Sequence, residues 1–360
     1  QGHLSELLEI WVGSDQVQVR IEAVHGLENE AEAALELEPL SDHRLEGNPL
    51  LVLVVAEGGF NSQSGRLLRL EKVVQDEALD VRDTKQVRLD RGGRLLNAAR
   101  HALQVVGLMN VQFAVKEELV YLLEVNPRGS RTVPFVAKAT GNAVAKIAAR
   151  LMAGAKLADF QMLTAPLSHV AVKEAVFPFS RFPGVDVFLG PEMKSTGEVM
   201  GIDNDFGRAF GKSQLAASTV LPLQGSVFIS VKDADKAAFI PICRELSGMG
   251  FEILATGGTT DALNAAGVPA KRINKVMEGR PHAVDAMLSN QISLVMNTAQ
   301  GAPAIRDSFS LRQTALKNNI PYYTTVSGSR AAVAAIKSMK EDKLGVKSIQ
   351  DYLPNRPDLS

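Results

Sequence analysis

Hydrophobic and polar positions follow a strand-like pattern in the middle of the chain. Residues 111–116 and 119–126 are two runs rich in Val, Leu, Phe and Tyr, and a charged pair, Glu117 and Glu118, separates them. This pattern predicts an antiparallel β-hairpin with the acidic pair at its tip. The polar residues inside the two runs stand out, because a buried amide or carboxylate is costly without a partner.

Three of these polar residues are predicted to meet on one face of the hairpin. Glu124 and Asn126 point to the same side because strand side chains alternate with a period of two. If the loop is centred on Glu118, Gln112 lies opposite Glu124 and joins them. Such oxygen ligands suit Mg²⁺ or Mn²⁺ bridging to nucleotide phosphates, and the planar fork of Arg128 suits a phosphate. From spacing alone, a second interpretation fits equally well: Gln112 is a polar edge-strand residue, and Glu124 and Asn126 begin a solvent-exposed turn before Pro127.

Short apolar runs alternate with helical stretches over residues 222–360. The predicted strands are residues 226–231, 251–255, 270–273, 292–297 and 322–325. The predicted helices are residues 235–247, 260–266, 282–289, 308–318 and 329–339. This alternation predicts a doubly wound parallel sheet with helices on both faces, which binds ligands beyond the carboxyl ends of its strands.

One strand-to-helix connection in this region has the composition of an anion site. Residues 255–260 read Ala-Thr-Gly-Gly-Thr-Thr, and their hydroxyls and backbone N–H groups would lie at a helix start. Lys236 and Lys275 would add positive charge there. An ordinary βα turn explains the same residues without any ligand.

Other stretches predict elements around the hairpin. Predicted helices cover residues 95–106, 133–140, 143–152 and 203–217, the last with Asp203 as its N-cap, and short helices cover residues 4–11 and 73–79. Predicted strands cover residues 170–179 and 198–201. Residues 1–100 contain no Met, Tyr or Cys, and Phe60 is their only Phe, so a boundary is expected near residue 100.

Composition excludes several functional classes. Lys and Arg number 39 against 40 Asp and Glu, and no basic stripe supports nucleic-acid binding. No apolar run reaches about 18 residues, so no membrane span is expected. The single Cys243 and the lack of a secretory leader favour a cytoplasmic location. Cys243 is interpreted as a small buried hydrophobe rather than a reactive thiol.

A family resemblance extends the analysis of the hairpin. Residues 107–116, 124–128, 131–136 and 138–141 closely resemble the second ATP-grasp unit of the carbamoyl phosphate synthetase large subunit, and residues 182–186 and 189–201 are also close to it. The resemblance implies that Gln112, Glu124 and Asn126 bind the metal ions that bridge ATP. It implies that Arg128 and Arg131 line the phosphate-transfer site. Mg²⁺ or Mn²⁺ is the implied ion with ATP, and K⁺ is a further candidate.

Residues 226–338 resemble the methylglyoxal-synthase-like allosteric domain of the same family, most recognisably at 274–282 and 320–325. The resemblance implies a phosphate site for a nucleotide effector of the UMP or IMP class, formed by Lys236, Thr256, Thr259 and Lys275. It also implies ornithine contacts at Glu174, Tyr322 and Thr324. Gly257 departs from members that carry His, and residues 297–301 lack a second hydroxyl. No methylglyoxal-synthase catalytic loop is present, so lyase activity is not expected.

The expected architecture is α/β, an incomplete ATP-grasp (α+β) unit followed by a doubly wound methylglyoxal-synthase-like domain. The expected boundaries are 1–100 (unassigned), 101–221 (ATP-grasp part) and 222–360 (allosteric domain). The family's glycine-rich ATP loop has no counterpart in residues 1–100, where residues 58–66 are nearest in composition. An aberrant or mis-registered segment is one hypothesis for these residues.

The resemblance implies a ligase that makes carbamoyl phosphate from bicarbonate, ATP and glutamine-derived ammonia for arginine and pyrimidine biosynthesis. This part would phosphorylate carbamate. The implied partners are the small glutaminase subunit and the amino-terminal ATP-grasp half of the large subunit. The alternative is a non-catalytic nucleotide-sensing fragment that lacks a complete ATP site.

Overall fold

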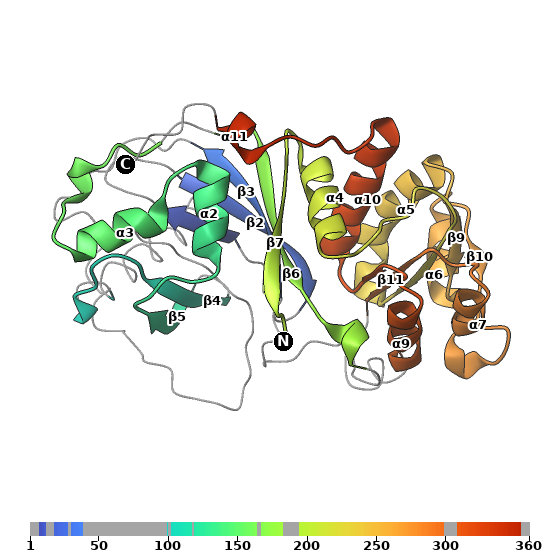
Figure 1. Cartoon of the computed structure of the whole chain (residues 1–360). Coiled ribbons are helices and arrows are strands. Elements are labelled where there is room, and N and C mark those ends of the chain that lie inside the picture. Colours follow the sequence, from blue (N-terminus) through green and yellow to red (C-terminus); the bar gives the residue numbers. More distant parts are fainter. Residues whose placement is uncertain are drawn as a thin grey trace, which may run out of the picture. The chain divides into compact units, whose positions relative to one another are not determined.

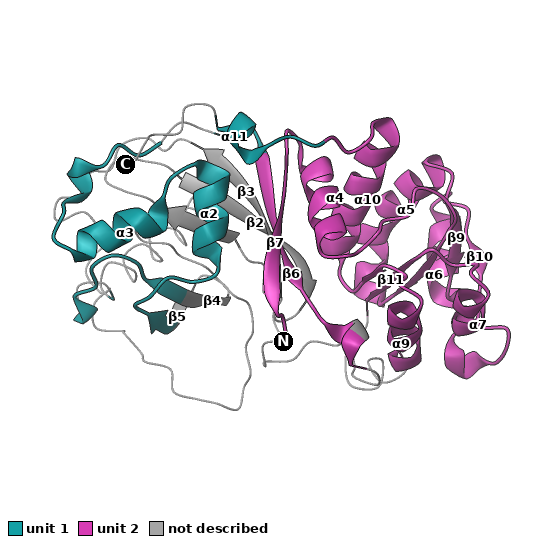
Figure 2. Ribbon diagram, viewed as in Figure 1, with its two compact units in different colours: residues 1–23, 33–169, 346–360 teal, residues 24–32, 170–345 magenta. Residues whose placement is uncertain are grey.

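The structure is a computed structural model that describes residues 7–11, 18–27, 30–38, 99, 102–116, 119–163, 167–182, 194–298 and 308–353 (Figure 1). Contacts divide the chain into two compact units (Figure 2). Unit 1 contains residues 1–23, 33–169 and 346–360, and unit 2 contains residues 24–32 and 170–345. The predictions for residues 58–66, 73–79, 183–193 and 299–301 lie outside the described residues.

Among the residues that the structure describes, three strands precede the predicted hairpin. They are β1 (Leu7–Trp11), β2 (Gln18–Leu27) and β3 (Glu30–Glu38). Strand β1 pairs antiparallel with β2, with Leu7 opposite Glu22 and Trp11 opposite Gln18. The prediction of a helix over residues 4–11 is therefore wrong. A run of five residues fits both the helical and the strand period, and pairing with a second strand decides between them.

Unit 1 contains the hairpin formed by β4 (Asn110–Lys116) and β5 (Leu119–Asn126), followed by α2 (Thr132–Thr140) and α3 (Val144–Met152). Gly141 is the C-cap of α2, and its φ of 78° is left-handed. Beneath α3, a small core forms from Ile147, Leu151, Leu157 and Phe160. A short helix, α11 (Ile349–Tyr352), also belongs to this unit.

Unit 2 begins with an antiparallel pair, β6 (Val170–Val176) and β7 (Gly197–Asp203), and helix α4 (Phe206–Ala216) follows it. Asp205 caps this helix, since its carboxylate accepts a hydrogen bond from the Arg208 N–H at 2.9 Å. The prediction that Asp203 is the N-cap is wrong. Asp203 is the last residue of β7, and its carboxylate lies 2.7 Å from Lys212 Nζ instead.

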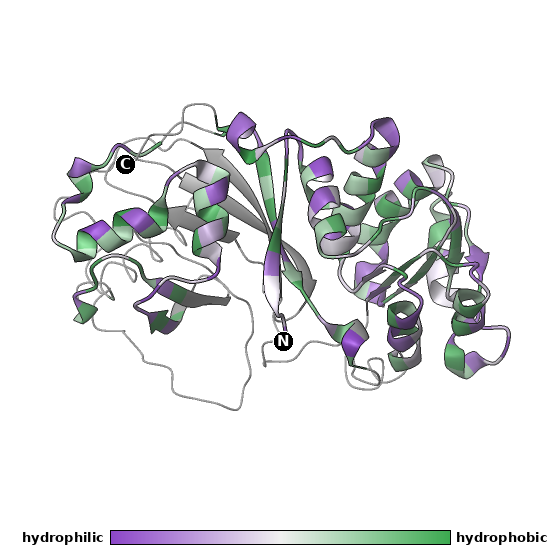
Figure 3. Cartoon of the chain, viewed as in Figure 1, coloured by the Kyte–Doolittle hydropathy of each residue, from purple (hydrophilic) through white to green (hydrophobic). Residues whose placement is uncertain are grey.

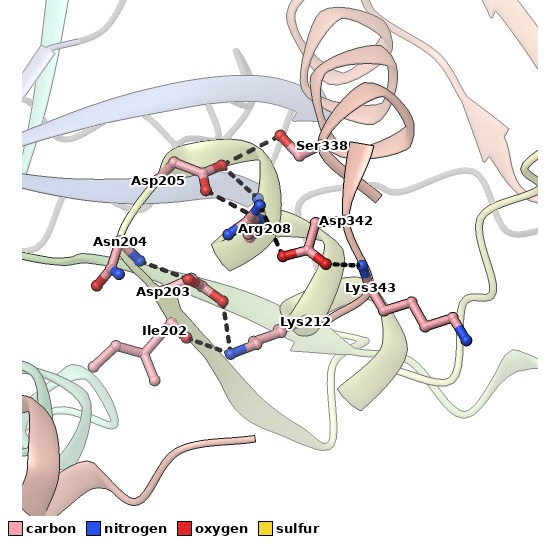
Figure 4. A network of polar contacts seen from close by, with 9 residues as sticks. All are labelled: Ile202, Asp203, Asn204, Asp205, Arg208, Lys212, Ser338, Asp342 and Lys343. Atoms are coloured by element: carbon pink, nitrogen blue, oxygen red, sulfur yellow. Dashed lines mark hydrogen bonds and ion pairs between the residues drawn. The ribbon is translucent and has the colours of Figure 1, made fainter. Parts of the chain in front are cut away.

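Helix α4 packs closely against α10 (Val326–Glu341) in the same unit. A Cβ at Gly207 would lie 2.7 Å from the backbone oxygen of Ala334, so a glycine is needed for this approach. Polar contacts flank the crossing, because Ser338 Oγ donates to Asp205 at 3.3 Å and the Arg208 guanidinium lies 3.4 Å from Asp342 (Figure 4).

A five-stranded sheet forms the rest of unit 2, and every adjacent pair in it is parallel. Its order is β10 (Lys271–Arg272), β9 (Glu252–Ala255), β8 (Ser226–Val231), β11 (Leu294–Thr298) and β12 (Tyr322–Tyr323). The connecting helices are α5 (Lys236–Gly248), α6 (Gly257–Ala265), α7 (Ala283–Leu288) and α9 (Phe309–Lys317). The predicted doubly wound α/β sheet is confirmed.

Hydrophobic residues bury both faces of this sheet, and Figure 3 shows hydrophobic stretches along its strands. On one face, Phe228 and Val295 pack with residues of α7 and α9, including Met287 and Leu311. Helices α5 and α10 pack against each other, and Phe239 of α5 is fully buried. Among the described residues, no helix has the length and apolar character that crossing a bilayer requires.

Candidate functional site

The hairpin in unit 1 has the register that the sequence predicts. Gln112 pairs with Glu124, and Asn110 pairs with Asn126. The register shifts between Gln112 and Phe113, which is the signature of a β-bulge. Only the backbone of Gln112 is described, so the direction of its side chain lies outside the described structure.

Glu124 and Asn126 lie on the same face of β5 and contact each other. The Asn126 Nδ2 donates a hydrogen bond of 2.7 Å to Glu124 Oε1. Glu124 is exposed and Asn126 is half-buried, so their remaining oxygens are accessible from solvent. One carboxylate and one amide oxygen at the end of a strand fit a hard divalent cation. The two residues therefore suit the predicted metal-ligand role.

Asn110 is a residue at this site that sequence reasoning missed. It lies opposite Asn126 in the hairpin and is 5% exposed. Its Nδ2 is buried and has no hydrogen-bond partner among the described residues. Asn110 is the first residue of β4, one position before the predicted strand, and the hairpin register places it opposite Asn126.

The two predicted arginines follow the hairpin in sequence. The Arg128 N–H donates to the Asn126 carbonyl at 2.8 Å, and its guanidinium donates to the Gly129 carbonyl at 3.1 Å. Arg131 directly precedes α2, and both side chains are exposed. Val133 and Val136 of α2 are buried, so the helix is held by packing. Arg131, its N-cap residue, is therefore held in place as well.

The second site lies at the switch point of the parallel sheet. Strands β8 and β11 are neighbours whose following helices leave on different faces, and such a point opens a crevice at the carboxyl ends of the strands. The Lys232 N–H bridges it by donating a hydrogen bond of 3.1 Å to Thr298 Oγ1. The carboxyl ends of β8, β9 and β11 therefore lie together at this edge of the sheet.

Three hydroxyl groups cluster where β9 ends and α6 begins. Thr256 Oγ1 lies 3.3 Å from Ser230 Oγ and 3.4 Å from Thr259 Oγ1. Thr256 is the N-cap residue of α6, but its side chain makes no capping hydrogen bond to the helix. The Thr259 N–H donates to the Thr256 carbonyl at 2.8 Å, whereas the N–H groups of Gly257 and Gly258 have no acceptor within the helix and could bind an anion. Sequence reasoning missed Ser230, and placed the helix start three residues too late.

Two lysines lie near this helix end. The Lys236 Nζ is 2.7 Å from the Asp233 carboxylate. The hydrogen bond and charge of Lys236 hold the pKa of Asp233 below its usual value, and the charge of Lys275 contributes to the same shift. Both lysines therefore act on the carboxylate of Asp233.

The three residues predicted to contact ornithine lie on β6 and at β12. Glu174 is on β6 opposite Val199 and is 8% exposed, so it is a buried carboxylate. The Tyr322 hydroxyl accepts a hydrogen bond of 2.6 Å from Asn297 Nδ2. Thr324 follows β12 and is half-buried.

Comparison with known proteins identifies both segments. Residues 82–160 match the family described as carbamoyl-phosphate synthase L chain, ATP binding domain. Residues 238–324 match the family described as MGS-like domain. The first match contains the hairpin and both arginines. The second contains α6 and the hydroxyls of Thr256 and Thr259.

Curated relatives agree with these matches. The carbamoyl phosphate synthase large chain of Rhizobium meliloti (strain 1021) is 54% identical over 270 residues, which are 73% of this chain and 23% of that protein. The large chain of Myxococcus xanthus (strain DK1622) is 55% identical over 257 residues, 71% of this chain and 24% of that protein. The chain thus spans about a quarter of the length of these relatives, and it belongs to the carbamoyl phosphate synthase large-chain family.

Proposed function

We propose that the chain is part of a ligase that makes carbamoyl phosphate from bicarbonate, ATP and glutamine-derived ammonia, and that its hairpin segment phosphorylates carbamate. The observation that carries the proposal is the 2.7 Å hydrogen bond from Asn126 to Glu124 on β5, together with the pairing of Glu124 with Gln112 on β4. This set lies inside the segment that matches the ATP-binding domain. A glutaminase subunit and an amino-terminal ATP-grasp half would complete the enzyme, in the cytoplasm.

In the proposed step, a carbamate oxygen forms a bond to the γ-phosphorus of ATP, the bond from that phosphorus to the β,γ-bridging oxygen breaks, and ADP leaves. Phosphoryl transfer needs positioning and charge stabilisation more than covalent help. Gln112, Glu124 and Asn126 would hold Mg²⁺ or Mn²⁺, which neutralises phosphate charge when bound. The guanidinium groups of Arg128 and Arg131 would orient the transferred phosphoryl group and stabilise its charge.

Substitution of Glu124 by Gln tests the catalytic proposal, because it keeps the size of the side chain and removes the carboxylate charge. Carbamate-dependent ATP turnover of the complete enzyme is expected to fall by about 100-fold or more. Glu245→Gln, an exposed change on α5, is the matched control and should leave turnover unchanged. Wild-type turnover in the Glu124→Gln enzyme would reject the role.

A regulatory function is favoured by a different observation, the uncapped start of α6 beside buried Thr256 and Thr259. The proposed ligand is a nucleoside monophosphate of the UMP or IMP class, with Lys236 and Lys275 balancing its phosphate charge. Calorimetric titration of the chain with UMP and with IMP tests this function. Glu174, Tyr322 and Thr324 would form a separate ornithine site, which titration with ornithine tests.

The same titrations separate the enzyme from a non-catalytic sensor. If the chain is part of the enzyme, it binds Mg-ATP, and Glu124→Gln weakens that binding. If it is only a sensor, it binds UMP or IMP, Thr256→Val weakens that binding, and no Mg-ATP binding depends on Glu124. Both outcomes together would indicate a regulated enzyme.

A further inference from the structure

Arg272 of β10 packs directly against the start of α6. A Cβ at Gly257, the first residue of this helix, would lie 3.2 Å from the Arg272 Cζ and 3.3 Å from its Nη2. A side chain at position 257 would therefore press against the guanidinium, which would have to shift by a few tenths of an ångström. A Cβ at Gly258 would lie 3.0 Å from Lys236 Nζ in the same way. The two glycines let two cations approach the first turn of the helix.

An anion at this helix start would be stabilised both by the helix and by the nearby cations. The start of a helix carries partial positive charge, and cations are stabilising at the opposite end. Lys236 is balanced by the Asp233 carboxylate at 2.7 Å. For Arg272, the structure records no ion pair with any residue that it describes, and its side chain is exposed. An unbalanced guanidinium beside uncapped N–H groups has the fork geometry that binds phosphate oxygens in pairs.

We propose that Arg272 binds the phosphate of the nucleotide effector, and that Gly257 determines this contact by leaving room for the guanidinium. The ligand class is a nucleotide whose terminal phosphate is a dianion at neutral pH. The inference rests on the regulatory function proposed above and adds a residue that sets affinity. A side chain at position 257 would push the Arg272 guanidinium away from the phosphate and so weaken their attraction.

Titration of the 360-residue chain with UMP and with IMP tests the inference. Loss of a charge-assisted hydrogen bond weakens binding by about 10- to 100-fold, so Arg272→Leu is expected to raise Kd by that factor. Arg272→Lys should give an intermediate Kd, because it keeps the charge and loses the fork. The matched control is Arg244→Leu, since Arg244 donates to the Ala266 carbonyl at the other end of α6.

A double-mutant cycle tests the part that Gly257 has in this contact. Gly257→Ala should weaken binding about 3- to 10-fold in the wild-type chain and have no effect on Kd in the Arg272→Leu chain, because the displaced group is then absent. If the wild-type chain binds neither nucleotide, the regulatory function and this inference both fail. If it binds and Arg272→Leu binds equally well, the role of Arg272 alone is overturned. Thermal unfolding of each variant identifies any loss caused by misfolding.

Discussion

The hydroxyl of Tyr323 donates a hydrogen bond of 2.9 Å to Oε1 of Gln214, and both side chains are buried. Tyr323 belongs to the edge strand β12 of the parallel sheet, whereas Gln214 belongs to α4, which follows the β6–β7 pair. The bond therefore joins α4 to the sheet that carries the proposed effector site. Both elements lie within unit 2.

Replacement of Tyr323 by Phe is expected to destabilise unit 2 by about 1–3 kcal/mol, since it leaves the buried amide oxygen of Gln214 without this donor. Denaturant unfolding followed by circular dichroism measures the change. Tyr322→Phe is not a suitable control, because Tyr322 bonds Asn297. The double variant Tyr323→Phe, Gln214→Leu should recover part of the loss. A fully additive double variant would contradict the coupling.

Two glycines of β7 provide a matched pair for the packing of α4. A Cβ at Gly201 would lie 2.5 Å from the Ser213 nitrogen and closer still to the Ala209 oxygen, and backbone atoms cannot move aside cheaply. Gly201→Ala is expected to cost about 3 kcal/mol, the upper part of the range for overpacking. At Gly197 the same Cβ would meet nothing within 4 Å, so Gly197→Ala should be neutral or slightly stabilising. Equal unfolding midpoints for the two variants would refute the packing argument.

The hairpin was predictable because its two strands are short runs of β-forming residues. Its register was predictable because a loop centred on Glu118 determines which residues lie opposite each other. Gln112 pairs with Glu124 as expected. The parallel sheet was predictable for a similar reason, because its strands are short buried runs that alternate with helices. Edge strands β10 and β12 are only two residues long, shorter than the predicted runs 270–273 and 322–325.

Other features depend on tertiary contacts that no local pattern contains. Asp205 and Asp203 are equally good caps by sequence, and the extent of β7 selects Asp205. Glu174 looks like a solvated strand residue, yet packing around β6 buries it. Gly257 and Gly258 suggest a turn, but α6 begins at Gly257.

Cys243 is expected to resist thiol reagents in the folded chain. Its side chain is fully buried in α5, and burial raises the pKa of the thiol to about 12. Only the thiolate is reactive, so at pH 8 about one thiol in 10,000 would be ionised. Ellman's reagent should label less than a tenth of the chain within an hour and label it fully in denaturant. Because Cys243 is the only cysteine, the signal has one source. Rapid labelling of the folded chain would contradict its burial.

His169 is expected to make the stability of unit 1 depend on pH. Its Nε2 lies 2.9 Å from the Ala139 carbonyl, an acceptor, so this nitrogen carries the proton and donates. The Nδ1 is buried with no partner among the described residues. Burial lowers the pKa of His169 below 6.5, with a further contribution from the charge of Lys347, while the bond to Ala139 opposes the shift.

The sign of the effect follows from proton binding. Below pH 6.5 the unfolded chain binds a proton at this histidine more readily than the folded chain does, so the free energy of unfolding falls as the pH falls. His169→Gln keeps a donor for Ala139 and removes the titration. Urea unfolding at pH 7.5 and pH 5.5 should therefore show a smaller loss of stability on acidification for His169→Gln than for the wild type. Equal losses in both chains would show that His169 is not protonated on unfolding, and the buried neutral imidazole would then be the wrong description.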